Sequence, residues 1–194
     1  MGLANIAAVL KENRIPCRIL DLCFVRDFEE AIVSEITLYQ PDLIGLSLRN
    51  LDNVSYPNYT SYLPFYRKII QIIRKKTSSR IIVGGSAFSL MPEAILSYLN
   101  ADFGIAGEGE RGIIALIHQI NAADKKGIEL KGRIIWDRDV GIVENLDDFP
   151  FPDRSGLDSE AYLQYGGMGN IQTKRGCPFN CIYCTYPIIE GKKV

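Results

Sequence analysis

The sequence lacks several features that mark common functional classes. It has one histidine in 194 residues, His118, which we interpret as an ordinary helix residue because a lone histidine rarely makes a site. No apolar run approaches the roughly 18 residues of a membrane span, and the apolar start has no basic region of the kind that signal peptides carry. The net charge of -1 gives no electrostatic footprint for nucleic acid. We therefore expect neither a membrane nor a nucleic acid as partner.

Cysteine is scarce but unevenly placed. There are five cysteines, an odd number, and three of them lie within residues 177–184. A secreted disulfide framework fits this distribution badly, whereas a metal site in a cytoplasmic protein fits it well. Cys17 and Cys23 lie six positions apart on one expected strand, hence on one face, and we interpret them as small buried apolar residues.

Apolar patterns in the first two thirds of the chain alternate between strand and helix. Helices are expected over 3–12, 27–40, 62–77, 91–100 and 111–126, and strands over 16–24, 41–48, 80–85 and 101–107. These strands are short and apolar on both faces, as parallel strands buried between two helix layers must be. The pattern predicts an α/β fold with a doubly wound, flavodoxin- or Rossmann-like parallel sheet, whose ligands bind where loops leave the carboxyl ends of the strands.

The first element is a helix, although a doubly wound domain begins with a strand. In the flavodoxin-like order the first strand is central, so its loss would leave a gap with unpaired backbone groups. We therefore expect that the first strand is missing from this chain. We expect the slot to be filled by residues 133–137, by residues 170–174 or by a strand of a second molecule, which would make a homo-oligomer through the incomplete sheet.

The alternation ends after the last long helix. Residues 132–146 read as a β-hairpin around a polar turn at 137–141, residues 147–158 are rich in Pro and Asp, and residues 170–174 read as a short strand. We expect three parts: a doubly wound domain over 1–145, a linker over 146–168, and a further segment over 169–194.

Three loops with small or polar residues are expected at the carboxyl edge of the sheet. Glycine in such loops lets a ligand approach the backbone closely, although glycine also simply makes turns. The spacing is no dinucleotide fingerprint, since the last loop lacks the third glycine. The candidate cofactor-binding residues are Ser47, Asn50, Gly84, Gly85, Ser86, Gly107, Glu108 and Gly109.

Aromatic residues recur every third position ahead of the helix at 62–77. They are Tyr56, Tyr59, Tyr62 and Phe65. A stacking lid over a flat ligand is one interpretation, but packing against the sheet is favoured because such rings bury large apolar areas.

Cys177, Cys181 and Cys184 have the spacing of ligands to one metal centre. Thiolate selects zinc, copper(I) or an iron–sulfur cluster. Structural zinc prefers four ligands, commonly two pairs, and no second pair exists here. Three cysteines leave one iron of a four-iron, four-sulfur cluster without a protein ligand, and such an iron can bind a substrate or cofactor.

The run "RGCPFNCIYC" at 175–184 resembles the signature of the radical S-adenosylmethionine superfamily. The resemblance implies that Cys177, Cys181 and Cys184 hold a 4Fe-4S cluster, whose open iron chelates S-adenosylmethionine. One electron then cleaves the sulfonium to give a 5′-deoxyadenosyl radical. It also implies that Tyr183 lies against the adenine of the cofactor.

Four further stretches look like the cobalamin-binding-type domain that precedes the catalytic barrel in one class of these enzymes. They are "DLIGLSLRN", "IIVGGSAFSLMPEAIL", "GIAGEGE" and "LDDFPFPDR", and the resemblance covers most of residues 1–160. The sequence has no Asp-x-His-x-x-Gly, so cobalamin would bind without a protein histidine on cobalt.

By resemblance, the parent protein is an oxidoreductase or transferase that reductively cleaves S-adenosylmethionine. It resembles methyltransferases and the anaerobic cyclase of magnesium-protoporphyrin ester, and would use a small-molecule substrate and an electron donor such as flavodoxin or ferredoxin. No catalytic residue is expected in these residues, since a full barrel needs on the order of 200 more, and the chain alone is expected to be inactive. The alternative is a non-catalytic ligand-binding module whose tail holds zinc or free thiols.

Overall fold

The core of the molecule is a four-stranded parallel sheet. The computed structural model describes residues 2–141, 143, 145–167 and 169–192. The strands are β1 (Leu43–Ser47), β2 (Arg80–Gly84), β3 (Phe103–Ala106) and β4 (Arg133–Trp136), in the spatial order β1-β2-β3-β4. All neighbouring pairs are parallel. The predicted α/β class with a parallel sheet is therefore confirmed.

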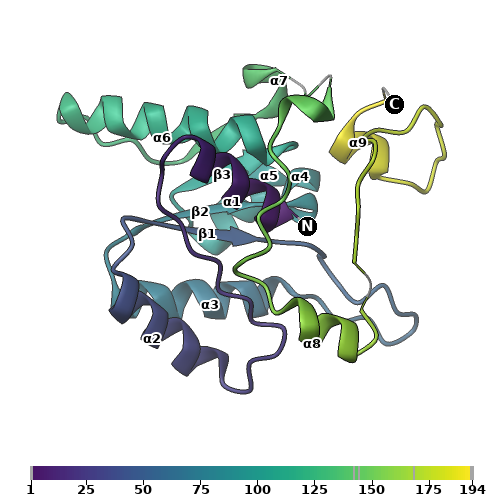
Figure 1. Cartoon of the computed structure of the whole chain (residues 1–194), viewed down its shortest axis with the longest axis horizontal. Coiled ribbons are helices and arrows are strands. Elements are labelled where there is room, and N and C mark those ends of the chain that lie inside the picture. The colour runs from purple at the N-terminus through teal and green to yellow at the C-terminus, as the bar shows by residue number, and fades with distance from the viewer. Residues whose placement is uncertain (1, 142, 144, 168, 193–194) are drawn as a thin grey trace.

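Helices cover both faces of the sheet (Figure 1). One face packs against α2 (Phe28–Tyr39), α3 (Leu63–Lys76) and α5 (Pro92–Leu99), and the other against α6 (Gly109–Lys125), which also contacts α1 (Gly2–Glu12). Successive residues of β2 serve the two faces, since Ile81 and Val83 belong to the first core and Ile82 to the second. This division follows from the alternation of side chains along a strand.

Local sequence signals account for several helix ends. The Asp27 side chain accepts hydrogen bonds from the Glu29 and Glu30 N–H groups, and α2 ends where Gln40 turns left-handed. Pro92 lies in the first turn of α5, and Asn100 ends this helix in the left-handed region. His118 is an exposed residue of α6, as expected.

The predicted hairpin over 132–146 is wrong. Residues 133–136 form β4, a parallel strand at the outer edge beside β3, and the residues of the predicted turn form α7 (Asp137–Val140). Ile135 is 1% exposed, so this strand is held by burial against α6 as well as by its ladder. The last residues of the predicted hairpin include 142 and 144, which lie outside the described residues.

The described sheet contains no central gap, and neither of the two fillers proposed from this chain occupies one. β4 lies at the edge beyond β3, far in strand order from β1, and residues 170–174 form no strand. Within the described chain, β1 pairs only with β2, so its other edge is open. Gly45 and Ser47 are exposed there.

The predicted strand over 16–24 is also wrong as a hydrogen-bonded element. Residues 15–20 keep a strand-like alternation, with Ile15, Cys17 and Ile19 half-buried between exposed neighbours, yet they pair with no strand in the described part of the chain. Cys17 is half-buried, but Cys23 is exposed, so the prediction that both are buried fails at Cys23. The segment has apolar contacts on one side and lacks a ladder partner.

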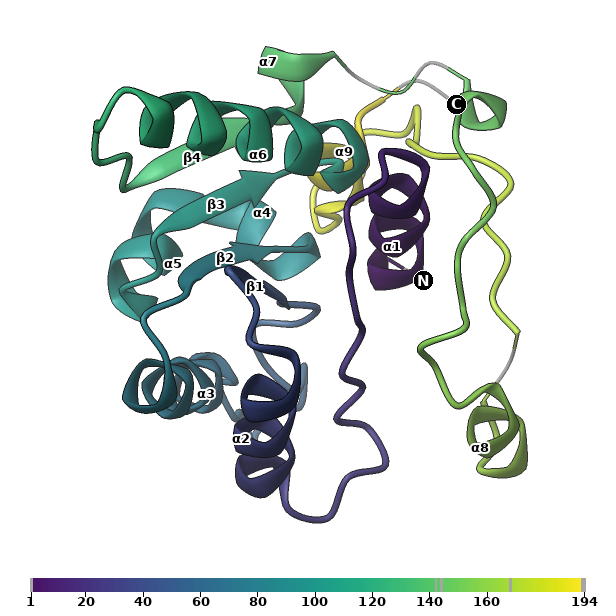
Figure 2. The same cartoon turned by 60° about the vertical axis from the view of Figure 1, so that its left-hand side comes forward.

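The predicted linker runs beside α1 (Figure 2) and is hydrogen-bonded to it. It contains the 3-10 helix η1 (Leu146–Asp148) and α8 (Ser159–Gln164). Asp153 donates its N–H to the Ala4 carbonyl at 2.9 Å, and its carboxylate pairs with Lys11 at 3.0 Å. Further along, Tyr162 stacks edge-on against Phe24, with ring centroids 4.8 Å apart.

The aromatic residues ahead of α3 divide into two groups. Tyr56 is 99% exposed and Tyr59 66% exposed, so the favoured packing interpretation is wrong for them. They lie on a short turn closed by an Asp52–Ser61 bridge, which carries them away from the sheet. Phe65 lies edge-on against Phe28 of α2 at 5.2 Å but is 44% exposed, so its ring contact is with a helix and the predicted packing against the sheet is not shown.

Candidate functional site: the carboxyl edge of the sheet and the cysteine segment

Two of the three predicted loops are joined by hydrogen bonds at the carboxyl edge of the sheet. Leu48, just after β1, donates to the Gly84 carbonyl at 2.8 Å, and the Ala87 N–H donates to the Leu48 carbonyl at 3.0 Å. The Ser86 hydroxyl donates to the Arg49 carbonyl at 2.7 Å. The loops that follow β1 and β2 are therefore joined by three hydrogen bonds.

The third predicted loop, after β3, is connected to the first two through α4 (Ser86–Leu90). The Gly107 N–H donates to the Ser89 hydroxyl at 2.8 Å, and that hydroxyl donates to the Gly85 carbonyl at 3.0 Å. The structure thus brings together the three loops that hold the candidate residues Ser47, Asn50, Gly84, Gly85, Ser86, Gly107, Glu108 and Gly109. That they contact a cofactor stays a prediction.

The two loop glycines with positive φ are required by the protein's own packing. Gly85 has φ 94°, and a Cβ there would lie 2.6 Å from the Leu48 carbonyl oxygen. Gly107 has φ 86°, and a Cβ there would overlap the Asp137 carboxylate. Both positions favour glycine for its conformation and for its missing side chain. The exposed groups at this edge include the polar residues Ser47, Arg49 and Asn50.

Glu108 faces the cysteine segment. Its side chain is 6% exposed, and its two oxygens accept from the Val143 N–H at 2.7 Å and from Arg175 at 3.1 Å. Glu110, in the first turn of α6, is equally buried and accepts from the same guanidinium at 2.5 Å. Sequence reasoning missed Glu110 and Arg175 as site residues; the repeated Glu in "GEGE" was the available signal.

The guanidinium of Arg175 stays charged in this buried position. Burial alone would lower its pKa, but the hydrogen bonds and negative charges of Glu110 and Glu108 outweigh burial and leave the pKa raised. The buried carboxylates are therefore matched by a permanent cation.

The three clustered cysteines lie on a loop between Arg175 and α9 (Tyr186–Glu190). All are free thiols; Cys181 is exposed, and Cys177 and Cys184 are half-buried. The Cys184 N–H donates to the Cys181 carbonyl at 3.1 Å, which closes a tight turn. Within the described residues, no three metal-type side chains converge on a common point. Tyr183, the residue expected beside adenine, is 86% exposed.

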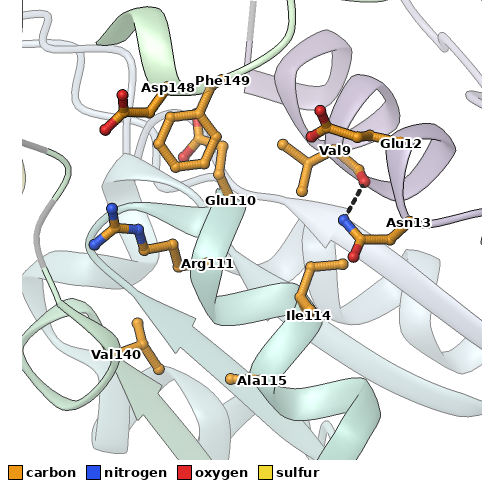
Figure 3. A pocket seen from close by; sticks show the side chains of 10 residues that line it. All are labelled: Val9, Glu12, Asn13, Glu110, Arg111, Ile114, Ala115, Val140, Asp148 and Phe149. Carbon is orange, nitrogen blue, oxygen red and sulfur yellow. Dashed lines mark hydrogen bonds between the residues drawn. The ribbon is translucent and has the colours of Figure 1, made fainter. Parts of the chain in front are cut away.

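A shallow groove of about 540 Å³ lies elsewhere, between α1, α6 and the residues Val140, Asp148 and Phe149 (Figure 3). The Arg111 guanidinium lies 5.8 Å from the centre of the Phe149 ring at one side of it, and Asn13 donates to the Val9 carbonyl at the other. Its lining includes Glu110 but none of the predicted cofactor residues.

No helix in the described chain is both long enough and apolar enough to cross a bilayer.

Comparison with known proteins places these features in context. The chain is 23% identical to the tryptophan 2-C-methyltransferase of Streptomyces laurentii, over 96% of this chain and 40% of that protein. It is 27% identical to an uncharacterized methyltransferase of Pyrococcus horikoshii, over all of this chain and 42% of that one. The chain therefore spans about two fifths of the length of these relatives.

Solved structures with the same fold include the radical S-adenosylmethionine methyltransferase TsrM from Kitasatospora setae. One structure of TsrM, with cobalamin and a [4Fe-4S] cluster bound, matches with a TM-score of 0.77 at 22% identity, over 98% of this chain and 39% of TsrM. Another, with tryptophan and a S-adenosylmethionine analogue bound, matches with a TM-score of 0.78 at 24% identity and the same coverage.

A family model decides the relationship. The B12 binding domain matches residues 1–117, which include β1 to β3, the three loops at their carboxyl ends and Glu108. This is more than half of the 194 residues. The chain belongs to the B12-binding domain family.

Proposed function

We propose that this chain is the cobalamin-binding part, with the cluster-bearing loop, of a radical S-adenosylmethionine methyltransferase. The observation that carries the proposal is a B12-binding domain match over 1–117, together with a three-cysteine loop joined to that domain by a buried ion pair. Relatives named as methyltransferases, one acting on tryptophan and one on cytidylyl-2-hydroxyethylphosphonate, support methyl transfer as the reaction class.

The donor set fits an iron–sulfur cluster. Cys177, Cys181 and Cys184 are soft ligands, are free of disulfides and occupy one loop. They would hold three irons and leave the fourth for S-adenosylmethionine, with Tyr183 beside the adenine. When bound, the cluster supplies the single electron that cleaves the sulfonium, and cobalamin carries the methyl group. The protein's own part is to hold the thiols and to keep them next to the domain.

The carboxyl edge of the sheet offers a polar, exposed surface for cobalamin. Ser47 and Asn50 can donate hydrogen bonds from the end of β1, and the loops after β2 and β3 are hydrogen-bonded next to them. His118 is exposed on α6, and the chain has no second histidine, so we propose that cobalt receives no histidine ligand from these residues. Ser47, Asn50 and the glycine loops are the proposed contact residues.

The substrate is proposed to be a small molecule and the electron donor a flavodoxin or ferredoxin. Methyl transfer is proposed for a protein of the relatives' length, and the 194 residues alone are expected to bind without turnover. We also propose that two copies associate through the open edge of β1, since unpaired N–H and C=O groups there can accept another strand. A measured mass of one chain in solution would contradict this last point.

Anaerobic reconstitution with iron and sulfide tests the cluster. We expect about four irons and four sulfides per chain and a brown protein. Single Cys→Ala changes at 177, 181 and 184 should each remove most of the iron. Cys23→Ala is the matched control, since Cys23 is an exposed thiol outside the loop. Less than one iron per chain in the unchanged protein contradicts the proposal, and one colourless zinc per chain favours a ligand-binding module with a zinc-holding tail.

Cobalamin binding is tested separately by titration with hydroxocobalamin, followed by its visible spectrum. We expect saturable binding that is weakened by Asn50→Ala. Binding that is unaffected by His118→Ala supports the absence of a histidine ligand, whereas a spectrum altered by that change contradicts it.

A further inference from the structure

The arginine that precedes the cysteine loop is buried between two glutamates of the B12-binding domain. Arg175 lies two residues before Cys177, and its side chain is 13% exposed. Its guanidinium donates to Glu108 at 3.1 Å and to both oxygens of Glu110, at 3.2 and 2.5 Å. The glutamate side chains are 6% exposed each.

The glutamates need a cationic partner when the segment covers them. Two carboxylates that are two residues apart and almost fully buried repel each other and have lost their hydration. The Val143 N–H satisfies one oxygen of Glu108, and only a cation can balance the charge of the pair. Arginine suits this position because its planar fork can bind two carboxylates at once and stays charged when buried.

The same guanidinium also organises the far end of the cysteine loop. Its Nε donates to the Gln172 amide oxygen at 3.3 Å, and the Gln172 amide donates to Glu190 at 3.1 Å. Glu190 ends α9 and accepts from the Tyr186 hydroxyl at 2.7 Å. One polar chain therefore links the start of α6 to both ends of the loop that carries the thiols.

Apolar packing contributes little to the loop itself. Phe179 is 69% exposed, Ile182 is fully exposed and Tyr183 is 86% exposed. The segment also contacts the domain through α9, which packs against the five-residue helix α4. The buried ion pair is thus the polar contact that ties the loop to the domain.

We infer that Arg175 is a positioning residue: with Glu108 and Glu110 it holds the cysteine loop at a fixed place beside the carboxyl edge of the sheet. Glu108 and Glu110 of the "GEGE" run are then the ion-pair partners of this arginine. The functional consequence rests on the proposed function, because a fixed loop would keep the cluster and the cobalamin at a constant separation. The docking itself requires neither cofactor.

Site-resolved thiol alkylation of the reduced, metal-free chain tests the docking. In Arg175→Met we expect Cys177 and Cys184, half-buried when the loop is docked, to react about tenfold faster, equivalent to about 1.4 kcal/mol of lost protection. Cys17, half-buried in another region, should be unchanged, and Cys23 and Cys181 are already exposed. Unchanged rates at Cys177 and Cys184 would overturn the inference, and so would an equal rise at Cys17, which would indicate general unfolding.

Arg80→Met is the matched control. Arg80 also forms a two-bond pair with a carboxylate, Asp124, but those side chains are 40% and 46% exposed. This change should leave all five alkylation rates as they are. If Arg175→Met fails to fold, Glu110→Gln serves in its place, since it removes one charge and leaves Arg175 paired with Glu108; a smaller rise at Cys177 and Cys184 is expected.

A charge exchange separates positioning from general stability. Arg175→Glu alone should free the loop, and the double variant Arg175→Glu with Glu110→Arg should restore slow alkylation of Cys177 and Cys184. No restoration would contradict a specific pairing. Because these measurements use metal-free protein, they can succeed while iron reconstitution fails, and the two proposals are judged independently.

Discussion

The sheet and the segments that flank it carry similar apolar patterns but are held in different ways. In the sheet region, Phe88 and Phe103 are completely buried. In the segments at 13–25 and 146–167, Leu20 is 36% exposed, Leu163 65% and Phe151 96%. The strands have neighbours on a ladder, whereas the flanking segments touch each other through isolated contacts, such as the Phe24–Tyr162 ring pair and the Tyr162–Asp21 hydrogen bond. Alternation in sequence therefore becomes a strand only where a partner strand is present.

The largest expected loss of folding stability is for a substitution in the sheet region, at Phe88. Its ring fills the space beside Gly104 that any Cβ there would enter, and it is 0% exposed. Phe88→Ala should lower the free energy of unfolding by about 3–5 kcal/mol, because it removes buried area and leaves a cavity. Urea denaturation followed by circular dichroism gives this value.

Leu20→Ala is the matched change in the flanking segment. Since Leu20 is exposed and has no ladder neighbours, we expect a loss of less than about 0.5 kcal/mol. A loss at Leu20 that equals the loss at Phe88 would mean that the flanking segment belongs to the core, and would remove the distinction.

The next effect concerns the loop that joins β3 to α6. Gly107→Ala forces a side chain into a positive-φ position and against the Asp137 carboxylate, so a loss of about 1–3 kcal/mol is expected. Gly127 also has a positive φ, 65°, but a Cβ there meets nothing within 4 Å. Gly127→Ala should therefore cost less than Gly107→Ala in the same denaturation experiment. Equal losses would show that the close approach of Asp137 is unimportant.

These contrasts explain what the sequence could and could not predict. Apart from the short helix α4, which was not predicted, the helices and strands from residue 27 to residue 126 follow from apolar periodicity and from caps such as Asp27, because their partners lie in the same region. The segment at 16–24 has the composition of a strand, but ladder formation depends on a neighbour that local pattern does not reveal. For residues 133–136 the polar turn at 137–141 suggested a hairpin, whereas burial of Ile135 against α6 favours the parallel edge of the sheet.

The candidate site divides in the same way. The meeting of the three loops was predictable, because parallel strands place their carboxyl ends at one edge. The pairing of Glu108 and Glu110 with Arg175 was not, since the partners are 67 and 65 residues apart and no periodicity joins them. Gly85 and Gly107 were predicted to let a ligand approach the backbone, which stays a prediction; the structure adds that protein atoms lie where a Cβ at either position would be.

A smaller effect is expected where the two flanking segments touch. The Tyr162 hydroxyl donates to Asp21 at 2.8 Å, and Tyr162→Phe should cost about 0.5–1.5 kcal/mol, the usual net value of such a bond. Burial, followed by the hydrogen bond to Asp21, raises the pKa of Tyr162. The contribution is thus fully present below the unfolded pKa of about 10 and is lost as pH rises through the folded pKa. Hydrogen exchange of residues 15–25, compared in the two proteins, measures it; no change in exchange would contradict the contact.

The smallest effect is expected at Asp153, where the linker meets α1. The hydrogen bonds from Ser155 and then the ion pair with Lys11 lower the pKa of Asp153 to about 2. A carboxylate with a lowered folded pKa stabilises the folded state above the unfolded pKa, about 3.9, and loses that contribution as pH falls towards about 2. Asp153→Asn should therefore make the linker more susceptible to proteases at neutral pH, as acid does to the unchanged protein near pH 3, while the unfolding of the sheet is unaltered. Because the Asp153 N–H still bonds to the Ala4 carbonyl, the linker should loosen without detaching. A change in sheet unfolding as large as the change in linker cleavage would show that the flanking segments and the sheet fold as one unit.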